Sequence, residues 1–113
     1  MITNLSYLEG MTEGDPGLIT EMIGIFSTQV TEFSALMQNF LEQKNWQELS
    51  KLVHKAKSSV AIMGMTELTE KLRKFEKLTM EEKEVHTYPE YVNSFTTASK
   101  DAVTELNNYL TTL

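Results

Sequence analysis

Apolar residues recur at spacings of three and four along almost the whole chain, and strand-like alternation is scarce. An α-helix turns once in about 3.6 residues, so this spacing places the apolar side chains on one face of a helix. A helix with one apolar face must bury that face against other elements. The pattern therefore predicts an all-α fold in which amphipathic helices share a core.

Capping residues separate a short helix from a long one in the first part of the chain. The short helix is expected over residues 4–11. Asp15 is a good N-cap, and Pro16 suits the first helical position because an N–H there would lack a helical partner. The apolar spacing that follows predicts a long helix that ends near Gln43.

Two further helices are expected in the middle of the chain. Asn45 can cap a helix whose apolar positions run to Met63. Gly64 is a natural stop, because glycine adopts the left-handed conformation at little cost. Thr66 can cap the next helix, which is expected to reach about Leu78.

The remaining residues predict a loop and a final helix. Residues 79–87 are polar, charged and aperiodic, which is typical of a loop. Pro89 then marks the start of a helix whose apolar positions run to Leu113. Four such helices with short connections bury their apolar faces best as an antiparallel four-helix bundle, with the short N-terminal helix covering one end.

The composition limits the size and the partners of this bundle. A chain of 113 residues fits a single domain over residues 1–113, and 41% hydrophobic residues suffice for a core without disulfides. The absence of cysteine excludes thiolate chemistry and cysteine-based metal sites. A net charge of −6 argues against nucleic acid or an anionic membrane as the partner. No leader sequence or long apolar run is evident, and we expect a cytoplasmic protein. The initiating methionine and the compact length favour a free-standing protein over a domain cut from a longer chain, and a monomer is the simpler expectation.

One histidine stands in a local basic patch of this acidic chain. No Asp or Glu occurs between Leu49 and Thr66. The helix over this stretch carries Ser50, Lys51, Lys55, Lys57, Ser58 and Ala61 around His54. On a helical wheel His54 lies about 140° from the centre of the apolar face, so its ring is expected to be exposed. Small neighbours would leave the imidazole reachable, and the ammonium groups would favour an incoming anion such as a phosphoryl group.

Other readings of these residues are weaker or remain open. An ordinary exposed histidine among solvated lysines is the plain alternative. No G-x-x-x-x-G-K-[ST] loop is present, so a kinase that uses ATP itself is not expected. A di-iron bundle needs Glu-x-x-His pairs, and none occurs. The second histidine, His86, lies in the predicted loop beside Glu84 and makes a weak case for a metal site.

The run His54-x-x-Lys57-Ser58-Ser59, followed by Gly64, resembles the signature of histidine phosphotransfer (HPt) domains. The resemblance covers about residues 5–78, and the last helix matches only as a generic bundle helix. Further positions that match are the Gly14-Asp15 turn, Phe26, Trp46, Leu49, Leu68, Leu72 and Glu76. The resemblance implies a phosphoryl carrier without ATP-dependent kinase activity.

The resemblance also implies roles for individual residues. His54 would accept a phosphoryl group from a receiver-domain aspartate and pass it to another receiver, and Lys57 would steady the phosphoryl oxygens. Ser58 stands where many members have glycine, and serine is small enough to keep the ring accessible. Glu76 falls where the next helix faces the histidine, and the resemblance leaves open whether Glu76 orients the ring.

The implied partners are response-regulator receiver domains and a hybrid sensor histidine kinase. The receiver would bring Mg²⁺, and this chain would bind no cofactor and no metal. The expected docking face consists of Ser50, Lys51, Lys55, Ser58 and Ala61. The alternative is a non-catalytic helical adaptor, either a degenerate relative that binds receiver domains without phosphorylation or an unrelated adaptor bundle. The presence of both His54 and Lys57 argues against the degenerate relative.

Overall fold

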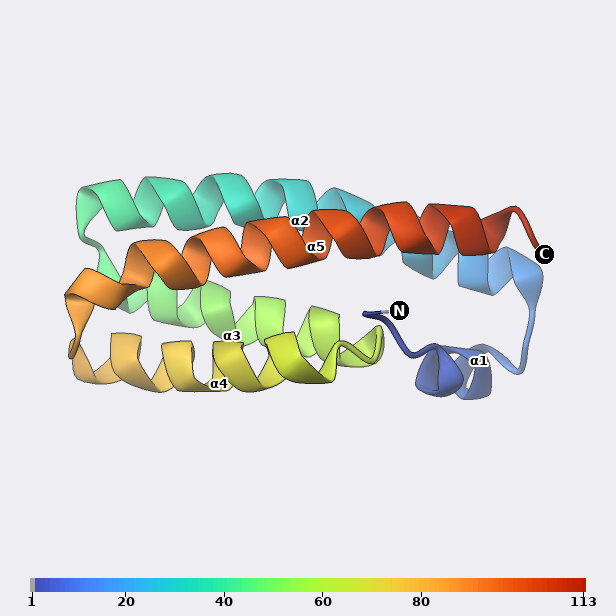
Figure 1. Ribbon diagram of the computed structural model, residues 1–113, viewed down its shortest axis with the longest axis horizontal. Coiled ribbons are helices and arrows are strands. Elements are labelled where there is room, and N and C mark those ends of the chain that lie inside the picture. The colour runs from blue at the N-terminus through green and yellow to red at the C-terminus, as the bar shows by residue number, and fades with distance from the viewer. Residues whose placement is uncertain (1) are drawn as a thin grey trace.

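The computed structural model describes residues 2–113, which form helices and no strand (Figure 1). The elements are α1 (Ser6–Thr12), α2 (Pro16–Gln43), α3 (Trp46–Ile62), α4 (Thr66–Glu81), the 3₁₀ helix η1 (Val85–Thr87) and α5 (Tyr88–Leu110). None of these helices is long and apolar enough to cross a membrane. The predicted all-α fold is confirmed.

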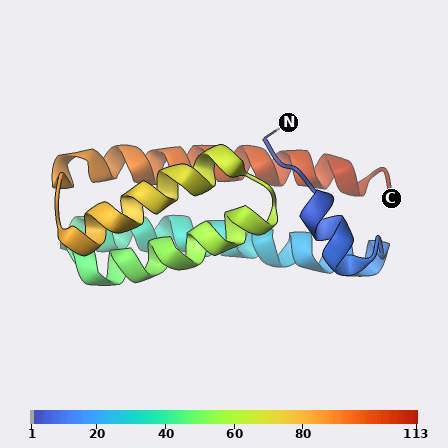
Figure 2. The same cartoon turned by 90° about the horizontal axis from the view of Figure 1, so that it is seen from below.

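The four long helices lie side by side as an antiparallel bundle about twice as long as it is wide, 43 × 20 × 20 Å (Figures 1 and 2). The helices α2 and α5 run its full length, whereas α3 and α4 form a shorter hairpin. The short helix α1 lies beyond the turn of this hairpin, beside the start of α2 (Figure 2). The expected four-helix bundle with an extra N-terminal helix at one end is therefore confirmed.

The core runs the length of the bundle and includes an aromatic cluster at one end. Trp46 and Phe75 meet the ring of Tyr88 edge-on, with centroid separations of 5.1 and 5.4 Å. The hydroxyl of Tyr88 lies 2.7 and 2.8 Å from the carbonyl oxygens of Leu78 and Lys83. Burial raises the pKa of this phenol, so it stays a neutral donor that ties α5 to the end of α4.

Side-chain caps begin α2 and α3 where the sequence predicts them. The carboxylate of Asp15 accepts hydrogen bonds from the backbone N–H groups of Gly17 and Leu18, at 2.8 and 3.2 Å. The amide oxygen of Asn45 accepts one from the backbone N–H of Glu48 at 3.3 Å. Both caps satisfy donors that would otherwise lack a partner in the first helical turn.

The start and the end of α4 differ from the prediction. Met65 occupies the N-cap position without a side-chain hydrogen bond, and Thr66 is the first helical residue rather than the cap. The helix also continues through the first part of the predicted loop, to Glu81. Thr79 is buried there, and its hydroxyl lies 3.0 and 2.8 Å from the backbone oxygens of Phe75 and Glu76, which accept its hydrogen bond. A polar residue that satisfies itself in this way can occupy a core position of a helix.

The final helix ends earlier than predicted. Its last helical residue is Leu110, and Leu113 lies beyond it with half of its surface exposed. The prediction that Leu113 belongs to the buried face is therefore wrong, because the apolar spacing continues past the point where the helix stops.

The N-terminal segment is held against α5 by one carboxylate. Glu105 accepts hydrogen bonds from the backbone N–H groups of Ile2 and Thr3 and from the hydroxyl of Thr3, at 2.7 to 3.2 Å. Burial alone would raise the pKa of Glu105, but these hydrogen bonds bring it below its ordinary value of 4.5. The segment continues to Asn4, whose N–H donates to the backbone oxygen of Met63 before Gly64.

The substitution Glu105→Gln is expected to flatten the loss of stability at acid pH. A carboxyl group whose folded pKa is lowered stabilises the fold above its unfolded pKa, and this contribution is lost as the pH falls through the folded pKa. At pH 7 we expect the variant to be about 1 kcal/mol less stable, a small effect because solvent screens the group. Urea unfolding over roughly pH 3 to 7 measures both effects. Parallel pH profiles for the two proteins would contradict this role of Glu105.

The substitution Gly64→Ala is expected to destabilise the fold by more than about 2 kcal/mol. Gly64 has φ +68°, and an added Cβ would overlap the backbone oxygen of Asn4. Gly24→Ala is the matched control, since Gly24 is helical with open space around it, and alanine there should stabilise the fold by up to about 1 kcal/mol. Urea unfolding of both variants distinguishes these opposite signs. Equal midpoints would show that the left-handed turn at Gly64 is not constrained.

Candidate functional site

His54 lies in the middle of α3 on the face that points away from the core. The same helix buries Val53 and Ala56 completely, so the ring of His54 is directed outward. The side chain of His54 is 62% exposed. The predicted exposure of the ring is therefore confirmed.

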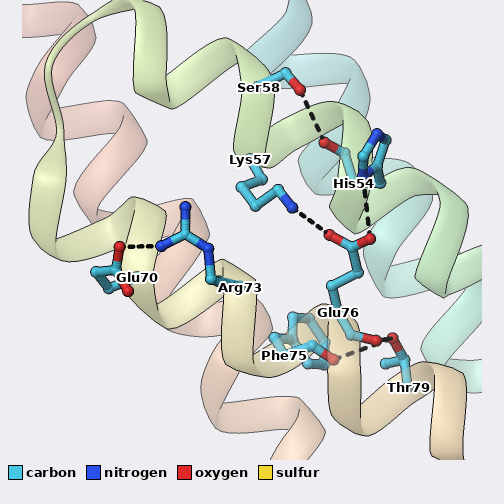
Figure 3. Close-up of polar contacts among 8 residues, drawn as sticks. All are labelled: His54, Lys57, Ser58, Glu70, Arg73, Phe75, Glu76 and Thr79. Atoms are coloured by element: carbon cyan, nitrogen blue, oxygen red, sulfur yellow. Dashed lines mark hydrogen bonds and ion pairs between the residues drawn. The ribbon is translucent and has the colours of Figure 1, made fainter.

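A single carboxylate on α4 contacts both the histidine and the lysine of the motif (Figure 3). One oxygen of Glu76 lies 3.0 Å from Nδ1 of His54. The other oxygen accepts a hydrogen bond from Nζ of Lys57 at 2.7 Å. Glu76 and Lys57 are only 17% and 21% exposed, so this ion pair is shielded from water far more than the imidazole is.

The charges of the cluster keep Glu76 ionised. Partial burial alone would raise its pKa, but the hydrogen bonds and charges of Lys57 and His54 lower the pKa below its ordinary value. An ionised carboxylate can only accept hydrogen bonds, so Nδ1 of His54 must carry the proton in this contact. The lone pair of the neutral ring is then on Nε2.

The remaining ring nitrogen is free to meet a partner. Figure 3 shows Nε2 of His54 on the side of the ring away from Glu76. An imidazole with a fixed tautomer and an accessible Nε2 lone pair is a good nucleophile. The cluster can therefore form a bond to an electrophile delivered from outside the bundle.

A protein-family model described as "Hpt domain" matches residues 21–113. The chain belongs to the Hpt domain family. Members of this family are histidine-containing phosphotransfer domains of phosphorelays and are in general phosphoryl carriers rather than kinases. The match begins within α2 and includes α5, the helix that resembled the family only generically in sequence. Comparison with curated proteins and with solved structures gave no significant match.

In the folded Hpt domain, carboxylates balance more of the positive charge around His54 than the sequence run suggests. Lys51 pairs with Glu48 at 3.3 Å, and Lys57 pairs with Glu76. Both carboxylates lie outside the stretch that lacks acids, so the sequence run alone overstates the local positive charge. Within residues 2–113, Lys55 has no carboxylate within ion-pair distance and keeps its full charge beside His54.

A shallow groove of about 560 Å³ runs beside the histidine. Its lining residues are Leu36, Phe40, Glu48, Ser50, Lys51, Leu52, His54, Lys55, Glu76 and Met80. Two of its apolar lining residues, Leu36 on α2 and Met80 on α4, are exposed, with exposed fractions of 41% and 68%. The sequence prediction missed these two residues, because neither is close to His54 along the chain.

The five predicted docking residues are not equivalent. Lys51 and Lys55 line the groove, as does Ser50, but Ser50 is only 9% exposed and offers little surface to a partner. Ser58 and Ala61 are exposed further along α3, outside the groove.

Neither Ser58 nor His86 takes part in the contacts around Glu76. The hydroxyl of Ser58 donates to the backbone oxygen of His54 at 3.3 Å, which keeps this small side chain folded onto its own helix. His86 lies exposed in η1 and makes no side-chain hydrogen bond among residues 2–113. The site is therefore built from His54, Lys57 and Glu76.

Proposed function

We propose that this Hpt domain accepts a phosphoryl group on Nε2 of His54 from the aspartyl phosphate of a receiver domain and passes it to a second receiver. The observation that carries the proposal is the exposed imidazole whose Nδ1 is held by Glu76 and whose Nε2 faces outward. A fixed tautomer removes the need to reorganise the ring when the donor arrives.

The transfer step needs positioning and charge more than covalent machinery. The Nε2 lone pair attacks phosphorus in line, the N–P bond forms, and the P–O bond to the aspartyl carboxylate breaks with its electron pair leaving on that carboxylate. The ring becomes cationic in this step, and the carboxylate of Glu76 beside Nδ1 stabilises the new charge. Lys57 is placed one helical turn from His54 and can turn from Glu76 toward the phosphoryl oxygens.

The surface beside the ring fits a receiver domain as partner. The free charge of Lys55 complements the acidic site of a receiver, and Leu36 and Met80 offer apolar contact across the groove. Lys51, Ser58 and Ala61 extend this docking face along α3. In this scheme the receiver brings Mg²⁺, a hybrid sensor histidine kinase supplies the phosphoryl group upstream, and the Hpt domain acts as a monomer that binds no metal or ATP.

The test is transfer of label from a phosphorylated receiver domain. The protein is incubated with the labelled receiver and Mg²⁺, and incorporation is followed by intact-mass spectrometry and autoradiography. The expected adduct is labile in acid and stable in alkali, as a phosphoramidate bond to histidine requires. Binding of several receivers without transfer would favour the adaptor role instead, and neither binding nor transfer would contradict both.

A further inference from the structure

Phosphorylated His54 must also give its phosphoryl group up, and this reverse step depends on the ring as a leaving group. When the N–P bond breaks, its electron pair returns to Nε2. If Nδ1 carries a proton, the ring leaves as neutral imidazole. If Nδ1 is bare, the ring must leave as the far more basic imidazolate. The proton on Nδ1 therefore decides how labile the phosphohistidine is.

The contact between Glu76 and Nδ1 is compatible with only one of these two states, the one in which Nδ1 carries a proton. The carboxylate oxygen of Glu76 lies 3.0 Å from Nδ1 and can accept a hydrogen bond from N–H, whereas it would repel a bare ring nitrogen. Partial burial alone would raise the pKa of Glu76, but the hydrogen bonds and charges of Lys57 and His54 lower it, so the group stays an acceptor at neutral pH. The low exposure of Glu76 makes its charge act strongly on the ring.

We propose that Glu76 is a positioning residue that sets the lability of the phosphohistidine, by holding the proton on Nδ1 so that the ring leaves phosphorus as neutral imidazole. The inference rests on the proposed function in so far as His54 carries the phosphoryl group. It deepens that function, because a residue outside the His54–Lys57 motif then controls how readily the carrier gives up its phosphoryl group.

Other charged groups around the ring do not have this geometry. Those that line the groove are Glu48, Lys51 and Lys55 from α3 and Glu76 from α4, with Lys57 held on Glu76. The contribution of α2 to the groove is apolar, from Leu36 and Phe40. Lys51 is paired with Glu48 and Lys57 with Glu76, and among the described residues Glu76 is the one whose carboxylate contacts the ring of His54 directly.

The test compares the lifetime of the phosphohistidine in the wild type and in Glu76→Gln. Phosphoramidate, a small donor that loses ammonia as its phosphoryl group moves to Nε2, loads His54 without any receiver. Glutamine has the shape of glutamate, but its amide can accept from N–H or donate to a bare nitrogen, so it no longer selects the protonated ring. We expect the half-life near pH 7.5 to lengthen about threefold to tenfold in the variant.

Two further measurements separate this role from general charge or packing effects. Glu70→Gln removes a carboxylate from the same helix, where Glu70 pairs with Arg73 and does not touch the ring (Figure 3), and should leave the half-life unchanged. We expect the hydrolysis rate to fall with rising pH, because the proposal requires a proton on Nδ1 of the phosphorylated ring, and this fall should occur at lower pH in Glu76→Gln. A merely structural role would change folding stability without moving this pH profile.

The effect must also persist without Lys57. In the Lys57→Ala background, Glu76→Gln should still lengthen the half-life, because the proposal acts through Nδ1 and not through the ion pair. The proposal is overturned if the half-life of Glu76→Gln equals that of the wild type, if Glu70→Gln behaves identically, or if the effect vanishes without Lys57. Loading by phosphoramidate with no transfer to or from any receiver would instead contradict the proposed relay, since the half-lives are measured without a receiver.

Discussion

The substitution His54→Gln is expected to reduce phosphoryl incorporation from a phosphorylated receiver by more than about 100-fold, to background. Glutamine can fill the space of the ring and make some of its hydrogen bonds, but it has no nucleophilic nitrogen lone pair. The side chain of His54 is 62% exposed and leaves the core untouched, so the variant should fold and still bind receivers. Intact-mass spectrometry after incubation with the labelled receiver measures the incorporation.

His86→Gln is the matched control for this experiment. His86 is the second histidine of the chain and is exposed in η1, away from the cluster on α3 and α4. Its replacement should leave the label at the wild-type level. Undiminished label in His54→Gln would show that the phosphoryl group resides on another residue, and circular dichroism of both variants excludes unfolding as the cause of a loss.

The helices were predictable wherever their signals are local. Asp15 and Asn45 accept hydrogen bonds from backbone N–H groups two or three residues ahead, and Gly64 takes the left-handed conformation where α3 ends, so these effects can be read from sequence alone. The close approach of Asn4 to Gly64 is a tertiary contact and could not be read in this way. Thr79 shows where this reasoning fails. Its polarity suggested a loop, but its hydroxyl finds partners on its own helix and the residue is buried.

The part of the site that lies on α3 was predictable from sequence, and the part that α4 supplies was not. The exposure of His54 and the position of Lys57 one turn later follow from the periodicity of α3. The contact with Glu76 does not, because it depends on the register of α4 against α3 across 22 positions of sequence. The burial of Ser50 likewise follows from tertiary packing and not from its place on the helical wheel.

The substitution Lys57→Ala is expected to slow transfer between His54 and a receiver about 10- to 100-fold while leaving the same residue phosphorylated in the end. The lysine supplies positive charge where phosphoryl oxygens meet Nε2, and an alanine supplies none. In the resting protein the ammonium lies 2.7 Å from Glu76, so the incoming phosphoryl group must compete with that carboxylate for it. Rapid-quench measurement of label on the protein against time gives the rate.

The same substitution also removes one partner of a shielded ion pair, so folding and transfer must be measured separately. Urea unfolding should show a loss of about 1 kcal/mol, too small to populate the unfolded state. Lys100→Ala on α5 removes an exposed lysine that does not line the groove, and this variant should transfer at the wild-type rate. Lys57→Arg keeps the charge but not the compact ammonium, so partial activity is expected. A wild-type rate for Lys57→Ala would show that Lys57 serves the fold through Glu76 and not the phosphoryl group.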